Sequence, residues 1–307
     1  HAAAAAFGFG APPLIEGLEF EDDNLSPEIA LNYYLNDNTS VYVAYKKAFK
    51  SGGIDNSALP TASINPLSPT FEGFDALIYD SEEADGFEIG LKSNLFDNNM
   101  RINATYYKYE YTDLQVQLFD ANIIQFSTFN AGAVETEGFE ADMLWYTDIE
   151  GLTLRGQFAW TDAVNTGDFF NTSGVNLKGS ERSYSPEIAG SLGLSYDSSL
   201  FSGWRYTFST DARYSDDYAW GVYRNSPRQD SYWINDAAIS IYSEDGKHSI
   251  NLIGRNLGDE IVIVTGGSTP GRIGTRTVPG IEAALLQDQN VTTQQGRTVT
   301  LQYKYKM

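Results

Sequence analysis

The sequence predicts an all-β fold: an antiparallel up-and-down transmembrane β-barrel to which this chain contributes about eleven strands. Three observations predict it. The residues from Val299 to the end of the chain alternate strictly between apolar and polar side chains, and similar alternating segments recur along the sequence. The connections between these segments alternate between tight turns and longer loops. Alternation with a period of two gives a strand one apolar and one polar face.

The last strand is the most regular of the set. Its apolar face consists of Val299, Leu301, Tyr303, Tyr305 and Met307. Its polar face consists of Thr300, Gln302, Lys304 and Lys306. The end of a soluble chain usually frays, so a regular strand at this position indicates pairing with a neighbour. We expect it to be the barrel-closing strand, with its apolar face in lipid.

The composition is compatible with a membrane barrel and argues against several other classes. Aromatic residues reach 14%, with 20 Tyr among them, and Tyr and Trp suit membrane–water interfaces, although ordinary β-proteins favour them too. No apolar run is long enough for a transmembrane helix. The chain has no cysteine, which excludes disulfides and thiolate metal sites. Its net charge of -21 argues against binding to nucleic acid.

Residues 1–24 are expected to be an irregular N-terminal segment or extracellular loop, and residues 25–307 the C-terminal part of the barrel. His1 followed by alanines does not make a signal peptide, because a basic segment and a long apolar segment are missing. We therefore expect the chain to be processed or truncated at this end.

Alternation and turn residues predict the strands in order. The first five are predicted at Glu28–Leu35, Thr39–Phe49, Gly86–Leu95, Met100–Leu118 and Ile124–Tyr146. The others are predicted at Leu152–Val164, Tyr184–Tyr196, Trp204–Ser215, Tyr232–Tyr242 and His248–Asn256, followed by the final strand. The pattern leaves open whether the tenth strand continues through Ile261–Val264.

The connections sort by length. Tight turns near residues 36, 97, 148, 200 and 244 alternate with longer loops near 65, 121, 173, 223 and 280. In an up-and-down meander, alternate connections lie at opposite ends. Bacterial outer-membrane barrels have short periplasmic turns and long extracellular loops. The pattern therefore predicts an outer-membrane location, extracellular long loops and a periplasmic C-terminus.

A soluble β-sandwich or β-propeller also has many strands. Neither is expected to sort its loops in this way, and no repeat of fixed period is present. Most predicted strands are also longer than the roughly 5–6 residues typical of soluble domains.

Seven stretches resemble, in order, the C-terminal half of a TonB-dependent outer-membrane receptor. They are Leu25-Ser-Pro-Glu28, Ala48-Phe-Lys-Ser-Gly-Gly53, Gly86-Phe-Glu-Ile-Gly-Leu-Lys-Ser93, Asn130-Ala-Gly132, Glu137-Gly-Phe-Glu-Ala-Asp142, Gly254-Arg-Asn-Leu-Gly-Asp-Glu260 and Gly296-Arg-Thr-Val-Thr-Leu-Gln-Tyr-Lys-Tyr305. Each is weak alone, and the ordered set is fairly specific. The chain departs from the family in ending at Met307, where an aromatic residue is usual.

The resemblance implies a barrel of 22 strands around a plug domain, and this chain contains no plug. It also implies energy-coupled import of a scarce solute, most commonly a ferric siderophore. The implied partners are the TonB complex, reached through the missing N-terminal plug, outer-membrane lipid and lipopolysaccharide, the barrel assembly machinery and a small solute.

The sequence gives no support for catalysis, a metal site or a cofactor. No phosphate-binding loop, zinc spacing or nucleophile elbow is present. His248 follows a tight turn and is expected to be a turn histidine. Two acidic clusters, around residues 19–23 and 80–85, lack the spacing of an EF-hand and are expected to be solvated loop charge.

Two groups of residues are candidates for function. Charged residues of the polar faces are expected to face the lumen, where they either contact a plug or solute path or form cross-strand ion pairs: Glu88, Lys92, Glu140, Asp142, Arg155 and Arg255. Aromatic residues of the loops are candidates for stacking on a solute, although they could equally pack between loops or lie among lipopolysaccharide: Phe71, Phe74, Tyr79, Phe169, Phe170, Tyr218, Trp220 and Tyr223.

TonB-dependent uptake is thus the leading hypothesis. A passive porin or structural outer-membrane barrel is the alternative, although single-chain bacterial barrels normally have an even number of strands. A secreted β-rich binding protein would have to bury its apolar faces between two sheets.

Overall fold

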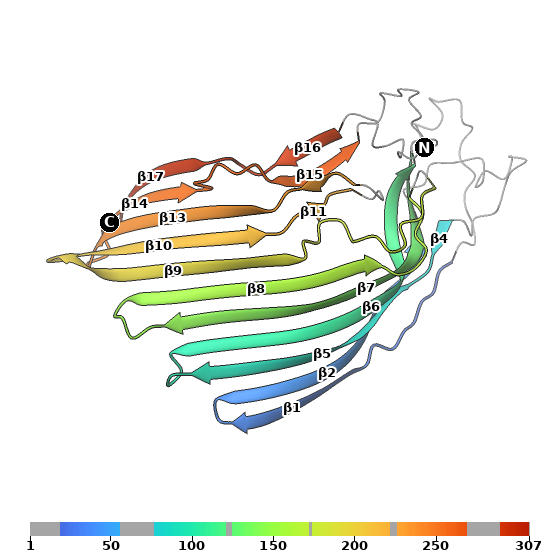
Figure 1. Cartoon of the computed structure of the whole chain (residues 1–307), viewed down its shortest axis with the longest axis horizontal. Helices are drawn as coiled ribbons and strands as arrows, with labels where there is room; N and C mark the ends of the chain where they lie inside the picture. The colour runs from blue at the N-terminus through green and yellow to red at the C-terminus, as the bar shows by residue number, and fades with distance from the viewer. Residues whose placement is uncertain are drawn as a thin grey trace, which may run out of the picture.

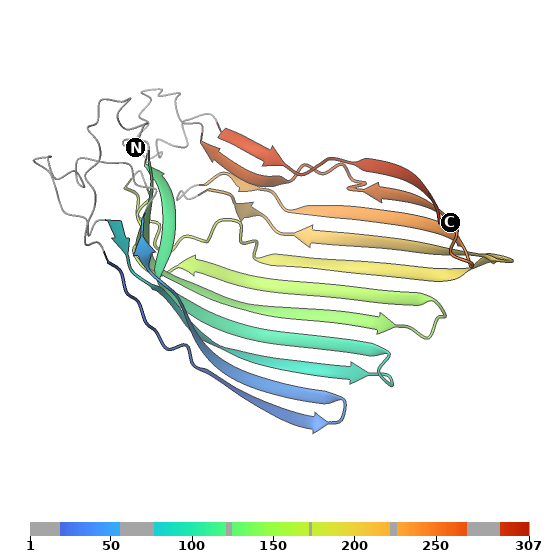
Figure 2. The ribbon, with the colours of Figure 1, turned by 180° about the vertical axis from the view of Figure 1, so that it is seen from behind.

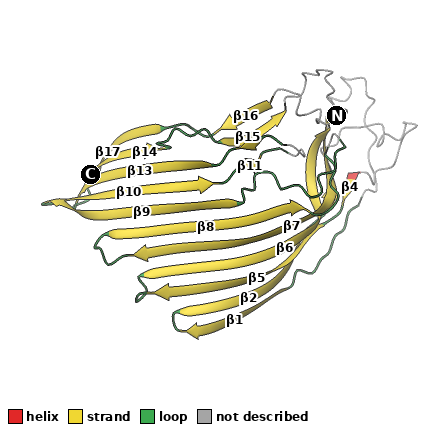
Figure 3. Ribbon diagram, in the orientation of Figure 1, coloured by secondary structure: helices red, strands yellow, loops and turns green. Residues whose placement is uncertain are grey.

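One antiparallel sheet dominates the structure, a computed structural model that describes residues 19–55, 77–120, 125–171, 174–221, 226–268 and 289–306. The sheet has eleven strands in the order β1-β2-β5-β6-β7-β8-β9-β10-β13-β14-β17 (Figure 1). Apart from a short 3₁₀ turn at Leu77 beside β4, the described residues form strands and loops, and none of them forms an α-helix (Figure 3). Accordingly, no helix in these ranges is long and apolar enough to cross a membrane. The predicted all-β meander of about eleven strands is confirmed.

The strands of the sheet are β1 (Glu28–Asn36), β2 (Thr39–Lys50), β5 (Glu82–Leu95), β6 (Met100–Asp120), β7 (Gln125–Tyr146), β8 (Leu152–Asn165), β9 (Ile188–Phe201), β10 (Trp204–Ser215), β13 (Tyr232–Ser243), β14 (His248–Arg255) and β17 (Thr298–Tyr305). Three two-stranded ribbons lie outside it: β3 (Gly53–Ile54) with β4 (Ile78–Tyr79), β11 (Tyr218–Ala219) with β12 (Arg228–Gln229), and β15 (Ile263–Ser268) with β16 (Gln289–Thr293).

The connections lie at the ends that the meander predicts. Tight turns gather at the end where β17 finishes, and the longer connections with their ribbons gather at the other (Figure 1, Figure 2). We call these the turn end and the loop end. The sheet of the described residues is open, with β1 and β17 at its two edges.

Several boundary expectations are wrong. β5 begins at Glu82 and not at Gly86, so most of the acidic cluster at residues 80–85 lies in a strand, and β9 continues past Tyr196 to Phe201. The strand predicted from Tyr184 begins at Ile188, because Tyr184 has a left-handed backbone with φ of 60°. The tenth strand ends at Arg255, because Asn256 is left-handed too, with φ of 47°, and Ile263 already belongs to the separate β15. The connection near residue 121 is shorter than a long loop, since β6 and β7 stay paired as far as Asp120 and Gln125, the last described residues on either side of it.

The sheet has an apolar face and a polar face, as the alternation predicts. Large hydrophobic side chains on the apolar face are exposed, including Leu192 at 66% and Leu301 at 73%. Others on this face are Val43, Phe87, Ile89, Phe139, Phe158, Trp233, Ile239, Leu252 and Tyr303. A soluble protein rarely exposes so extensive an apolar surface. This face therefore needs an apolar environment outside the chain.

Aromatic rings border the apolar face at the turn end. Ring contacts of about 6 Å join Phe96 to Trp145, and Tyr196 to Tyr206. At the loop-end border, polar atoms of the rings meet carboxylates: Tyr106 Oη donates to Glu137 at 3.2 Å, and Trp160 Nε1 donates to Glu187 at 3.2 Å. Such girdles flank the lipid-facing band of outer-membrane barrels.

Candidate functional site

The polar face is organised by side chains that cross over a neighbouring strand. Tyr42 on β2 reaches across Gly90 on β5, and its hydroxyl lies 3.0 Å from Thr105 Oγ1 on β6. A Cβ atom on Gly90 would come within 2.2 Å of the Tyr42 ring. Glycine is therefore required at this position so that the ring can lie flat on the sheet.

The same arrangement recurs two strands further along the sheet. Tyr107 on β6 crosses Gly138 on β7, and its hydroxyl lies 3.2 Å from Thr161 Oγ1 on β8. A Cβ on Gly138 would lie 2.5 Å from the Tyr107 hydroxyl. Two tyrosines thus each tie three strands together through a central glycine.

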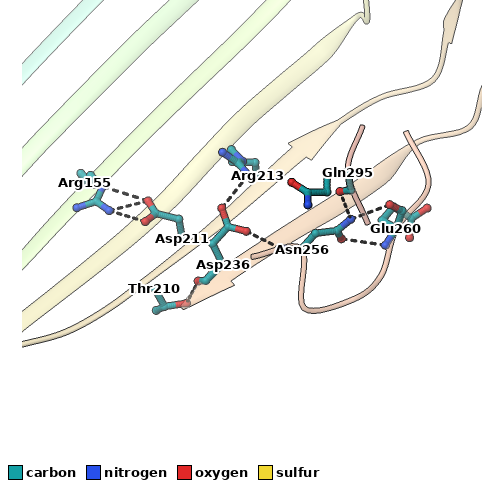
Figure 4. A network of polar contacts seen from close by, with 8 residues as sticks. All are labelled: Arg155, Thr210, Asp211, Arg213, Asp236, Asn256, Glu260 and Gln295. Carbon is teal, nitrogen blue, oxygen red and sulfur yellow. Dashed lines mark hydrogen bonds and ion pairs between the residues drawn. The ribbon is translucent and has the colours of Figure 1, made fainter. Parts of the chain in front are cut away.

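A charged pair makes a third crossing. Arg155 on β8 reaches across Gly193 on β9 to Asp211 on β10, with hydrogen bonds of 3.1, 2.7 and 2.6 Å (Figure 4). A Cβ on Gly193 would lie 2.5 Å from Arg155 Nε and 2.6 Å from Asp211 Oδ1. The fork of the guanidinium holds both carboxylate oxygens, which is the strongest geometry for such a pair.

A hydrogen-bonded network continues from β10 to the loop end (Figure 4). Arg213 Nη2 donates to Asp236 Oδ2 at 2.9 Å, and Asp236 Oδ1 accepts the backbone N–H of Asn256 at 2.8 Å. The Asn256 side chain in turn binds Glu260, donating to its carbonyl at 2.8 Å and accepting from its N–H at 2.9 Å. Asn256 is 5% exposed, so its amide groups find their partners within the protein. The network links the polar face to the base of the β15–β16 ribbon.

A hollow of about 640 Å³ lies on the polar face between β6 and β13. Its wall includes Asn103, Thr105, Glu140, Asp142, Gln157 and Arg213. Small side chains, Ala159, Ala189 and Ser191, line it too. Asp142 accepts two hydrogen bonds from the Asn103 amide, at 3.1 and 3.0 Å. The hollow can receive a polar group of a partner or solute, with hydrogen-bonding and carboxylate groups in its wall.

All six charged residues predicted for the lumen share the polar face, by the register of their strands. Their surroundings differ. Glu88 accepts from Lys46 Nζ at 3.0 Å and from Tyr109 Oη at 2.5 Å. Lys92 Nζ lies 5.3 Å from the centre of the Tyr42 ring, within the range of a cation–π contact. Glu140 and Arg255 make no salt bridge to another residue of the described ranges.

The predicted aromatic residues separate into buried and exposed rings. Phe169 is 5% exposed and packs with Ala131 and Leu177, and Trp220 and Tyr218 are 4% and 7% exposed. Phe170 is 54% exposed. Tyr79 is half-buried on β4. In this conformation, the rings of Phe169, Tyr218 and Trp220 are covered by protein, and Phe170 offers the most open surface of the five. Phe71, Phe74, Tyr223 and Met307 lie outside the described residues.

Charged residues at the loop end form contacts that the sequence did not indicate. The Arg228 guanidinium binds the carboxylates of Glu181 and Asp217, of which Asp217 Oδ2 lies 2.6 Å from Nε. The hydrogen bonds that Arg228 donates to Glu181 and to Asp217 raise the pKa of Arg228 above its usual value. Burial lowers the pKa of Arg182, whose Nη1 donates to Asn165 Oδ1 at 3.0 Å. Glu181 belongs to the β8–β9 connection, whereas Arg228 belongs to the β10–β13 connection. Local spacing could therefore not have predicted the contact between them.

The polar atoms form no evident metal centre. Within the described ranges, no three His, Asp or Glu side chains are grouped to hold a metal ion. His248 begins β14, where its Nδ1 lies 2.8 Å from the Tyr303 hydroxyl and its ring packs 5.0 Å from that of Tyr305.

Comparison with known protein families gives a match over most of the chain. The family described as "TonB dependent receptor-like, beta-barrel" matches residues 6–257. No curated protein sequence matches the chain.

Solved structures with a similar fold include receptors for siderophores and ferric complexes. The ferric yersiniabactin uptake receptor FyuA from Yersinia pestis superposes with a TM-score of 0.68 at 16% identity, over 91% of this chain and 36% of that one. The siderophore receptor PiuA from Acinetobacter baumannii gives 0.62 at 20% identity, over 91% and 35%. The ferric-catecholate import receptor Fiu from Escherichia coli K12 gives 0.60 at 19% identity, over 91% and 34%. The chain thus spans about a third of the length of these structures.

Proposed function

Because the chain belongs to the TonB-dependent receptor β-barrel family, we propose that it supplies part of the barrel wall of an outer-membrane transporter for a ferric siderophore or a similar iron complex. Members of this family are transporters, not enzymes. Energy for uptake would come from the TonB complex through a plug domain, which the matched barrel region does not include.

The single observation that carries the proposal is the two-faced eleven-stranded meander. Its apolar face is exposed and bordered by aromatic rings at both ends, as expected for a wall in lipid. Its polar face bears a hydrogen-bonded hollow instead of an apolar core. A wall of this kind separates lipid from an aqueous or plugged lumen.

The choice of an iron complex rests on the fold neighbours, which are receptors for ferric yersiniabactin, ferric catecholates and siderophores. At identities of 16–20%, the neighbours support the class of solute and not its identity. In the proposed orientation the turn end is periplasmic and the loop end extracellular. Residues 25–307 form the C-terminal part of the barrel, and its charged polar-face residues meet the plug or the solute path.

The proposal is tested by uptake in iron-starved cells that carry the complete gene, with and without a functional TonB. We expect accumulation of radioactive iron from one member of a siderophore panel, and loss of that accumulation without TonB. Uptake that persists without TonB, together with passage of small sugars, would establish the passive porin instead.

A further inference from the structure

The β15–β16 ribbon stands outside the main sheet and is held at two separate places. It lies at the loop end beside β11 (Figure 1, Figure 2). Its base is the pair of segments at 256–262 and 294–297 that lead to β14 and β17. Its flank is the β15 strand, which meets two other loops.

Hydrogen bonds that involve backbone groups of both segments fix the base. Asn256 is tied to Asp236 and Glu260 as described above, and Gln294 N donates to the Val262 carbonyl at 2.8 Å. Val262 is 1% exposed. Arg297 N also donates to Asp259 Oδ1, at 2.9 Å. The base is thus continuous with the main sheet.

The flank is held by side chains. Ile263 N donates to Gln229 Oε1 at 2.9 Å, and the Ile263 carbonyl accepts from Tyr218 Oη at 2.9 Å. Gly266 N donates to Tyr184 Oη at 3.1 Å. These side chains take the place of a neighbouring strand along β15. Three side-chain hydrogen bonds join β15 to the neighbouring loops. The flank can therefore move away from those loops without breaking any bond of the main sheet.

Trp220 covers the same strand. Its ring lies against Gly266, where an added Cβ would come within 2.3 Å of Cε3. Trp220 is 4% exposed, and β15 contributes to that burial. Moving the flank away would uncover the indole.

Tyr184 joins the three loops and is itself strained. Its φ of 60° is left-handed, which is a genuine outlier for a bulky side chain and persists only when the surroundings enforce it. The surroundings are the flank contacts: Tyr184 N donates to the Ala219 carbonyl at 2.7 Å, its ring lies 6.0 Å from that of Tyr218, and its hydroxyl binds Gly266. Release of β15 removes one of these restraints.

We infer that Tyr184, Tyr218 and Trp220 form a latch that positions the β15–β16 ribbon at the mouth of the barrel and can open while the base stays fixed. They are positioning residues, and Trp220 acts by covering β15. The role at the mouth rests on the proposed function. The existence of the latch does not, since it follows from the contacts of the flank alone.

Hydrogen exchange of the purified protein in detergent tests the latch. Trp220→Ala is expected to speed exchange of the 263–266 amides about tenfold or more, because the flank opens more often. Amides of β13 and β14 should keep their rates. Trp220→Phe should restore much of the protection, because a ring again covers Gly266. Tyr184→Phe, which removes one hydroxyl, should have a smaller effect confined to the same amides.

Phe170→Ala is the matched control, since Phe170 is an exposed aromatic residue of the β8–β9 connection, where it forms a bridge with Asn176. It should leave exchange in β15 unchanged. The inference is overturned if Trp220→Ala and Tyr184→Phe both leave the 263–266 amides unchanged, or if exchange rises equally across the main sheet. Uptake is measured on the unmodified protein in parallel. Faster β15 exchange in Trp220→Ala, with no TonB-dependent uptake by the unmodified protein, would overturn the proposed function alone. TonB-dependent uptake by the unmodified protein, with unchanged β15 exchange in the variants, would overturn the latch alone.

Discussion

The two faces of the sheet are specified in different ways. On the polar face, side chains reach across a neighbouring strand to a defined partner, as Tyr42 does over Gly90 and Arg155 over Gly193. On the apolar face, large side chains such as Leu192 and Leu301 stand exposed. The structure of the polar face therefore depends on the shape of each side chain and on its particular hydrogen-bond partner. The apolar face requires only that its side chains be apolar.

This difference predicts which changes each face tolerates. A hydrophobic exchange on the apolar face alters little, because lipid adapts to its shape, whereas a charge there must be buried in hydrocarbon. On the polar face a charge can find water or a partner, but one added methyl group can separate a crossing pair. The predictions below test this contrast on matched positions.

The largest effect is expected from a charge on the apolar face. Leu192→Arg should destabilise the protein in lipid vesicles by about 2–4 kcal/mol, the cost of Arg near the middle of a bilayer. Ser195→Arg, on the polar face of the same strand, is the control and should cost far less, because its cross-strand neighbours Thr153 and Ser209 are small and polar. The free energy of unfolding from urea titration measures both. Equal costs would mean that the apolar face does not meet lipid.

A methyl group on the polar face comes next. Gly193→Ala should cost about 1–3 kcal/mol, because its Cβ would push Arg155 and Asp211 apart and leave both charges poorly paired. Gly156 on the apolar face is the matched position, since its Cβ would meet Leu192 at an ordinary 3.4 Å. Gly156→Ala should be neutral or stabilising, by up to about 1 kcal/mol. The same urea titration compares their free energies of unfolding. If Gly156→Ala destabilised the protein more than Gly193→Ala, the importance of the Arg155–Asp211 pair across Gly193 would be contradicted.

Removal of single hydroxyls from two adjacent tyrosines should give a smaller contrast. Tyr107→Phe loses the bond to Thr161 on the polar face and should cost about 1 kcal/mol. Tyr106→Phe loses a bond to Glu137 at the wet border of the apolar face, where water replaces it, and should cost less. Thermal unfolding of both variants in the same detergent measures which of them loses more stability. A larger loss of stability in Tyr106→Phe than in Tyr107→Phe would show that the hydrogen bond from Tyr107 to Thr161 contributes little to stability.

Much of the main sheet was predictable from sequence because a single rule, alternation with a period of two, determines its faces. The strands from Leu152 and Trp204 begin where the alternation begins. The errors occur where one residue leaves that rule. Tyr184 and Asn256 take left-handed conformations, which are stabilised by partners distant in the sequence and so leave no local pattern.

The candidate site was less predictable for the same reason. The polar-face residues Glu88 and Arg155 were found because alternation places them. Their partners Tyr109 and Asp211 were not, since these depend on the register between strands. At the loop end, Trp220 was predicted either to stack on a solute or to pack between loops, and the sequence could not decide between them, because the room for its burial is made by Gly266 in a distant strand.

The smallest expected effect in this comparison of the two faces concerns Ser243, a polar residue on the apolar face. It is 7% exposed, and its hydroxyl donates to Asp245 Oδ1 at 2.6 Å in the adjoining turn. The hydrogen bond from Ser243, with that from the N–H of Lys247, holds the pKa of Asp245 below its usual value. The pKa of an aspartate in an unfolded chain is about 4. The ionised Asp245 therefore stabilises the folded protein above that pH, and the stabilisation is lost as the pH falls through the lower pKa of the folded protein. The expected difference in unfolding free energy between the protein and Asp245→Asn is therefore small at pH 7 and vanishes in acid. Ser243→Ala should remove most of the same pH dependence. A difference that grows as pH falls would mean that Asp245 is not held by Ser243, and that the apolar face accommodates this hydroxyl by some other contact.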